Sequence, residues 1–133
     1  MLCTEFRKAV DRMANNDVTK KVPMELICML ILRERDMYGY EMVQEIKARS
    51  GELLAFNLAS VYVVLRRLEE NGYVTARSEM SDPARARLRV YYHLEPGAEA
   101  YMEKQMVEYL RTVQGVQNLF QSCEAAYADQ KKA

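Results

Sequence analysis

A stripe of seven apolar residues near the C-terminus constrains this chain more than any other feature. Its members are spaced 4, 3, 4, 3, 4 and 3 residues apart: Met102, Met106, Tyr109, Val113, Val116, Phe120 and Cys123. This is the repeat of a helix that packs along another helix. Pro96 is expected to start the helix and Tyr127 to lie near its end. Roughly thirty helical residues extend about 45 Å, farther than a small core can cover. We therefore predict that a second copy of the chain buries the stripe, in a homodimer.

Three shorter helices are expected before this long one. Residues 23–35 are apolar on nearly every side, which is typical of the central helix of a small core. A second helix is predicted at about residues 40–49. A third is predicted over residues 58–71, with Asn57 as its N-cap and Gly72 as its C-terminal stop.

The helix over residues 58–71 has two different faces. Four leucine and valine residues recur at helical spacing and are expected to face the core: Leu58, Val61, Leu65 and Leu68. The opposite face carries small and basic residues, with Tyr62 on its flank: Ala59, Ser60, Val63, Arg66, Arg67 and Glu70. One face therefore anchors the helix and leaves the other available to a partner.

A β-hairpin is predicted directly after these helices. Residues 73–79 are rich in strand-forming side chains, and residues 88–94 alternate between apolar and polar. The segment 81–84 between them, Ser-Asp-Pro-Ala, has the composition of a turn. Three helices followed by a hairpin are the element order of a winged helix-turn-helix, a mainly α (α+β) fold.

The pattern favours DNA as the partner of the 58–71 helix. Ser60, near the helix N-terminus, is suited to a phosphate. Arg66 and Arg67 are able to reach guanine edges or phosphates in a major groove. Val63 points outward, and two interpretations stay open for it: contact with a thymine methyl group, or an ordinary surface valine.

The hairpin is expected to supply a second contact. Between Ala84 and His93 there are three arginines and no acidic residue. They fit a neighbouring phosphate backbone or a minor groove, although a solvated basic loop is the simpler alternative. The rings of five tyrosines are expected to pack in the core and between its elements, while their hydroxyls, that of Tyr62 above all, are candidates for phosphate contacts: Tyr38, Tyr40, Tyr62, Tyr91 and Tyr92. The full predicted DNA-binding set is Tyr38, Asn57, Ser60, Tyr62, Val63, Arg66, Arg67, Arg85, Arg87 and Arg89.

Composition excludes several other classes of protein. The chain has three cysteines at wide spacing and one histidine, His93, so no metal site, disulfide framework or cofactor is expected. It lacks glycine-rich phosphate loops and catalytic motifs, and we predict that it is not an enzyme. No apolar run is long enough to span a bilayer and no signal peptide is evident, so we expect a cytoplasmic protein without membrane contact. Lys and Arg balance Asp and Glu at 19 each, so only a local basic patch is available for nucleic acid.

Five short motifs give the sequence a resemblance to a known family. In order they are Tyr38-Gly39-Tyr40-Glu41, Ser60-Val61-Tyr62, Leu65-Arg66-Arg67-Leu68-Glu69, Gly72-Tyr73-Val74 and Tyr91-Tyr92-His93-Leu94. Over about residues 22–120 the chain resembles the PadR family of bacterial transcriptional regulators, and its small subgroup with a single long C-terminal helix. The resemblance implies a homodimeric repressor with residues 80–89 as its wing. It also implies a possible effector, a small apolar or phenolic molecule bound at the dimer interface.

These observations predict three parts of the chain. Residues 1–21 hold an amphipathic helix, expected at 4–14, and a linker. Residues 22–95 form the winged helix-turn-helix, and residues 96–133 form the dimerisation helix and a tail. The function we predict is sequence-specific regulation of transcription on a palindromic operator. The alternative is a winged-helix module that binds other proteins and not DNA.

Overall fold

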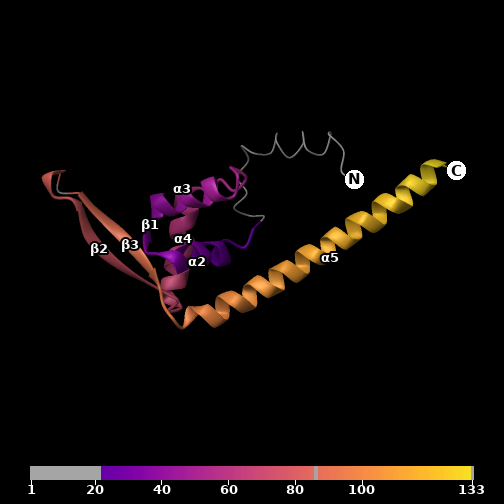
Figure 1. The fold of residues 1–133 in the computed structure, drawn as a ribbon. Coiled ribbons are helices and arrows are strands. Elements are labelled where there is room, and N and C mark those ends of the chain that lie inside the picture. The colour runs from indigo at the N-terminus through magenta and orange to yellow at the C-terminus, as the bar shows by residue number, and fades with distance from the viewer. Residues whose placement is uncertain (1–21, 86, 133) are drawn as a thin grey trace. The chain divides into compact units, whose positions relative to one another are not determined.

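The computed structural model describes residues 22–85 and 87–132, and Figure 1 shows their path. The elements run in the order α2 (Met24–Glu34), β1 (Met37–Tyr38), α3 (Gly39–Arg49), α4 (Leu58–Glu70), β2 (Val74–Asp82), the short 3₁₀ helix η2 (Pro83–Arg85), β3 (Arg87–Leu94) and α5 (Ala98–Lys132). The expected winged helix-turn-helix fold with a long C-terminal helix is confirmed. The helix predicted at 4–14 lies outside the described residues, as does Cys3.

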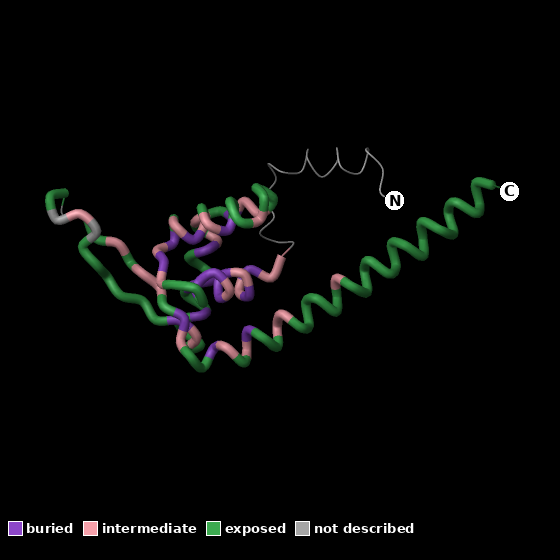
Figure 2. The backbone as a smooth tube through the Cα atoms, viewed as in Figure 1, coloured by how far each residue is buried: buried purple, intermediate pink, exposed green. Residues whose placement is uncertain are grey.

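The chain forms two compact units, the first ending at Glu99 and the second beginning at Ala100. In the first unit the core lies where α2, α3 and α4 meet, which Figure 2 shows as the buried part of the tube. α2 is its central helix, as its apolar composition predicts: Met24, Leu26, Cys28, Met29, Ile31 and Leu32 are all buried. Burial raises the pKa of the Cys28 thiol to about 12, so this side chain serves as core packing and not as a nucleophile.

α4 is amphipathic and both of its ends have defined signals. Val61, Val64, Leu65 and Leu68 are buried, whereas Leu58, expected in the core, is half-buried. The side-chain Oδ1 of Asn57 accepts a hydrogen bond from the Ala59 N–H at 2.8 Å, which confirms the predicted N-cap. Gly72 has a φ of 77°, a left-handed conformation that ends the helix.

The strands form a three-stranded antiparallel sheet in the order β1-β3-β2, in which β1 precedes α3 and the other two strands follow α4. β2 and β3 form the predicted hairpin and are longer than the predicted strands at its outer end. Their register slips by one residue between Met80 and Asp82, which is a β-bulge. The strand β1 was not predicted. It pairs Met37 with Tyr92 and thereby attaches the segment before α3 to the hairpin.

α5 is a single helix of 35 residues. It begins at Ala98, two residues after Pro96, and continues past Tyr127 to Lys132. Before it, the Glu95 carboxylate accepts a hydrogen bond from the Thr75 hydroxyl at 2.8 Å, which ties this segment to β2. Figure 2 shows α5 exposed along most of its length. None of the described helices combines the length and the apolar character needed to cross a lipid bilayer.

Candidate nucleic-acid interface

The outer face of α4 is exposed, as predicted from its pattern. Val63 is 57% exposed and Tyr62 is 44% exposed, although large apolar side chains are usually covered. Arg66 is exposed and Ser60 half-buried on the same helix. Because α4 is held by its buried stripe and by the Asn57 cap, it presents these side chains from a rigid support.

Arg66 and Arg67 differ in their surroundings. The Arg67 guanidinium lies 3.5 Å from the Glu25 carboxylate, so it turns back toward α2. Arg66 is exposed, and its positive charge tends to lower the pKa of Tyr92 on β3. Burial raises the pKa of the Tyr92 hydroxyl above its usual value, and the charges of Tyr62 and Glu69 add to this. Of the two predicted base-reading arginines, the geometry therefore favours Arg66.

The arginines of the wing, defined as β2, η2 and β3, have three different environments. Arg85 is 77% exposed and lies 3.6 Å from Asp82. Arg87 is exposed on the first residue of β3. The Arg89 guanidinium stacks over the Tyr38 ring, 4.4 Å from its centroid. Arg89 and Tyr38, predicted separately as DNA contacts, therefore hold each other in place.

A network that was not predicted from the sequence surrounds this stack. The Tyr38 and Tyr91 rings meet edge to face, with centroids 5.5 Å apart. Arg77 of β2 lies over the other aromatic ring, that of Tyr91, at 5.5 Å. Arg77 was missed because it precedes the basic segment and because β1, which brings Tyr38 to the sheet, has too few residues to show a pattern.

Asp36 joins all three strands. Its carboxylate lies 2.7 Å from Nδ1 of His93 on β3 and accepts a hydrogen bond from Arg77 on β2. Partial burial tends to raise the pKa of Asp36, but the bonds from His93 and Arg77 outweigh it and hold the pKa below its usual value. His93 thus has a structural partner, and in the described part of the chain no cluster of His, Cys, Asp or Glu is suited to a metal ion.

The tyrosines depart from the expected core packing. Tyr40 is 54% exposed and Tyr62 is 44% exposed. Tyr38, Tyr91 and Tyr92 are half-buried, so none of the five lies fully inside the core. The Tyr62 ring packs between α4 and Gly39 of α3, whereas the exposed Tyr40 departs from the expectation. The core volume is filled instead by methionine and leucine side chains, including Met29, Met42 and Leu65.

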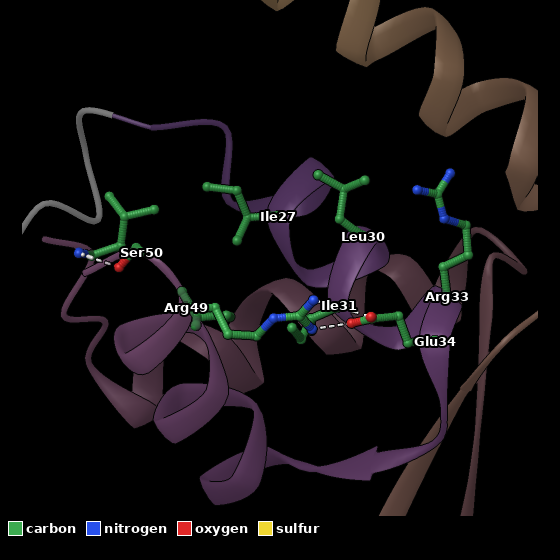
Figure 3. A pocket seen from close by; sticks show the side chains of 9 residues that line it. Ile27, Leu30, Ile31, Arg33, Glu34, Arg49 and Ser50 are labelled. Atoms are coloured by element: carbon green, nitrogen blue, oxygen red, sulfur yellow. Dashed lines mark hydrogen bonds and ion pairs between the residues drawn. The ribbon is translucent and has the colours of Figure 1, made fainter. Parts of the chain in front are cut away.

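A separate hollow of about 380 Å³ is lined by α2, α3 and the loop after α3, with no residue from α4 or the wing (Figure 3). Its apolar lining consists of Ile27, Leu30, Ile31, Ile46 and Leu54. At its edge Arg49 donates to Glu34 at 3.0 Å, so these two charges satisfy each other. The hollow therefore offers an apolar floor and little polar chemistry.

The predicted stripe on α5 is largely exposed within one chain. Met102 is buried and Met106 and Val113 are half-buried. Tyr109, Val116 and Phe120 are 38%, 44% and 59% exposed. Tyr127, 56% exposed and four residues after Cys123, continues the same spacing and was not included in the predicted stripe.

Comparison with known proteins identifies the family. The model of the transcriptional regulator PadR-like family matches residues 28–104, more than half of the chain. The chain belongs to the PadR-like family. The match spans α3, α4 and the wing, so this PadR-like chain is a DNA-binding transcriptional regulator with a winged-helix fold.

Individual relatives agree with this assignment. An uncharacterised protein X of Lysinibacillus sphaericus is 32% identical over 98 residues, which cover 73% of this chain and 86% of the relative. The structure of a transcriptional regulator from Clostridium thermocellum is 26% identical, with a TM-score of 0.63, covering 71% of the PadR-like chain and 89% of its own. Bacillus subtilis PadR in complex with operator DNA has the same fold, with 17% sequence identity and a TM-score of 0.56. The aligned region covers 62% of this chain and 46% of the Bacillus subtilis chain.

Proposed function

We propose that this PadR-like regulator is a repressor that binds a palindromic operator as a homodimer. α4 enters the major groove, and the wing contacts the adjacent backbone or minor groove. The observation that carries the proposal is the exposed outer face of α4, with Ser60, Val63 and Arg66 on a helix whose other face is fixed in the core. In a major groove, arginine donates hydrogen bonds to guanine edges and apolar side chains contact thymine methyl groups.

Further side chains support the backbone contacts. Asn57 caps the N-terminus of α4, where a helix attracts phosphates, and the exposed Tyr62 lies one turn farther along the helix. Arg85 and Arg87 extend from the outer end of the wing, while Arg89, two residues farther along β3, is stacked on Tyr38. In this proposal Arg67 contributes least, because Glu25 already holds it.

The dimer rests on the stripe of α5. The stripe follows a heptad repeat, and about half of the surface of Val116 and Phe120 is exposed. Its proposed interface residues are Met102, Met106, Tyr109, Val113, Val116 and Phe120. A second copy supplies the same stripe in a two-fold arrangement. Two α4 helices related by that axis require half-sites about one helical turn apart.

The dimer interface is also where an effector is proposed. Tyr109 and Phe120 supply aromatic surface there, and Met106 supplies an adaptable apolar side chain. A small apolar or phenolic molecule fits such a lining, and its binding would relieve repression. Because its proposed binding partner is chromosomal DNA, the protein is proposed to act in the cytoplasm. It is proposed to need no cofactor.

A mobility-shift titration over a salt series tests the proposal. Duplexes are first selected by the purified protein from a random library. A regulator that makes several phosphate contacts loses affinity steeply as salt rises. A protein-interaction module enriches no sequence and shifts no duplex at low salt, and that result would reject DNA binding.

A further inference from the structure

The two faces of the wing are chemically different. Directly opposed residues of an antiparallel pair share one face of the sheet. On one face the pairs are Val74 with Leu94, Ala76 with Tyr92, Ser78 with Val90, and Met80 with Leu88. On the other face the pairs are Thr75 with His93, Arg77 with Tyr91, and Glu79 with Arg89. Apart from Ser78, the first face carries only apolar and aromatic side chains from its base to its outer end.

Only the base of this face is buried. At the base Val74 is 1% exposed and Leu94 is 9% exposed. Farther out Val90 is 41%, Met80 51% and Leu88 63% exposed. Single exposed apolar residues are common on protein surfaces, but here a cross-strand pair and its neighbour form one continuous strip. The core does not need this strip, since the helices cover only the base.

The position of Met80 and Leu88 favours insertion into a partner. They are the last regular pair before the bulge, beyond which Asp82 pairs with Arg87. A bulge at this place bends the strand and re-aims its side chains. The apolar pair is therefore presented at the projecting end of the wing.

The chemistry around the pair favours a nucleic acid over a second apolar protein surface. Arg87 precedes Leu88, and Arg85, 77% exposed, lies in the turn just beyond the bulge. A minor groove combines phosphates at its edges with the apolar faces of sugars and stacked bases, and arginine is attracted into it. The strip also continues inward to Tyr92, which is half-buried and pairs with Ala76.

We propose that Met80 and Leu88 form an apolar wedge that enters the minor groove of the operator and bends the duplex. The inference rests on the proposed DNA binding and adds a means of selecting sequence. Apolar side chains inserted at a base step unstack it and kink DNA by roughly 20–90°. Flexible pyrimidine–purine steps kink most easily, so the operator is expected to carry one at the wedge.

The test compares variants on a duplex that the wild-type protein selects from a random library. Leu88→Thr and Met80→Thr each replace an apolar side chain of the wedge by a smaller, more polar one that still favours a β-strand. Leu88→Ile is the matched control, because it keeps the side chain apolar. Bending of the duplex is measured by energy transfer between dyes at its two ends. The affinity of each variant for the duplex is measured over a salt series. Both threonine variants are expected to lose the bend and to bind roughly tenfold more weakly. Their salt dependence and unfolding temperature should stay unchanged, since the altered side chains are exposed and touch no phosphate.

The outcomes separate this inference from the proposed function. Threonine variants that bend and bind like the wild type would overturn the wedge and leave DNA binding intact. A change in their oligomeric state by light scattering would also overturn it, and would assign the strip to a second copy of the chain. A wild-type protein that selects no duplex overturns the proposed function and the wedge together.

Discussion

The ring of Tyr62 lies directly over Gly39, so closely that a Cβ atom at Gly39 would stand 2.7 Å from the ring. Gly39 is the first residue of α3, and Tyr62 belongs to the exposed face of α4. A side chain at Gly39 would therefore have to displace the Tyr62 ring; backbone conformation sets no demand there, since among the described glycines only Gly51 and Gly72 have a positive φ. The contact sets how near the start of α3 lies to the proposed DNA-binding helix.

Gly39→Ala is therefore expected to destabilise the protein by about 1 kcal/mol, because the Tyr62 ring must leave its preferred position. In a Tyr62→Ala background the same change should stabilise it by about 0.5–1 kcal/mol, since alanine favours a helix over glycine. Urea unfolding of the four proteins gives the coupling between the two sites. An equal effect in both backgrounds would show that the contact does not restrict Gly39.

Changes at Asn57 should separate folding from DNA binding. Asn57→Ala removes the cap of α4 and is expected to cost about 1 kcal/mol of unfolding free energy. Asn57→Asp keeps the acceptor and suits the helix N-terminus, so stability should be retained. The added negative charge should nevertheless weaken operator binding. If Asn57→Asp binds DNA as well as the wild type, Asn57 does not lie at the interface.

Arg66 and Arg67 form a matched pair for testing base recognition. Arg66→Ala should cost about 1–3 kcal/mol on the selected duplex and less on random DNA. Arg67→Ala should change operator affinity by under about 0.5 kcal/mol, since this exposed side chain is engaged with Glu25. Fluorescence anisotropy measures the affinity of each variant and of the wild-type protein for the selected duplex and for random DNA. A similar loss on specific and random DNA for Arg66→Ala would mean that it contacts only phosphate.

Asp36 gives the stability a defined pH dependence. Its pKa is lowered in the folded protein, so its contribution is present above the unfolded pKa of about 3.9 and is lost as the pH falls through the lower folded value. Asp36→Asn should therefore destabilise the protein near neutral pH by about 1 kcal/mol. The difference from the wild type should shrink as pH falls below about 4. Urea unfolding from pH 7 to pH 3 provides the measurement, and a constant difference would exclude Asp36 as the source.

A charge in the α5 stripe should prevent assembly. Val113→Glu, like Met106→Glu, would place a carboxylate inside the proposed helix pair, which costs several kcal/mol. We expect a monomer by light scattering and loss of operator binding. Gln114→Glu adds the same charge one residue farther along the exposed helix and should remain dimeric. A Val113→Glu protein that stays dimeric would show that the stripe is not the interface.

The sequence predicted the helices and the hairpin because each has several residues with a clear period. The buried residues of α4, its Asn57 cap and its Gly72 stop all follow from local chemistry. Val64 was absent from the predicted stripe although it is buried, since the width of the covered face depends on what packs against it.

The sequence predicted which residue types form the interface, but not which side chains contact one another within the protein. Arg66 and Arg67 are equivalent in sequence, yet only Arg67 is near Glu25, which is 42 residues away. Arg89 was grouped with Arg85 and Arg87, but β1 brings Tyr38 under it. Two residues of strand carry no periodic signal, so long-range pairings that depend on β1 had no basis for prediction.

The position of β1 links the mechanics of the two proposed DNA contacts. Its last residue, Tyr38, pairs with Tyr91 of the wing, and the very next residue, Gly39, begins α3 beneath Tyr62. Two consecutive residues therefore connect the wing to the helix that carries the proposed base-reading side chains. A substitution at this junction is consequently expected to change the placement of both surfaces at once, and not of one alone.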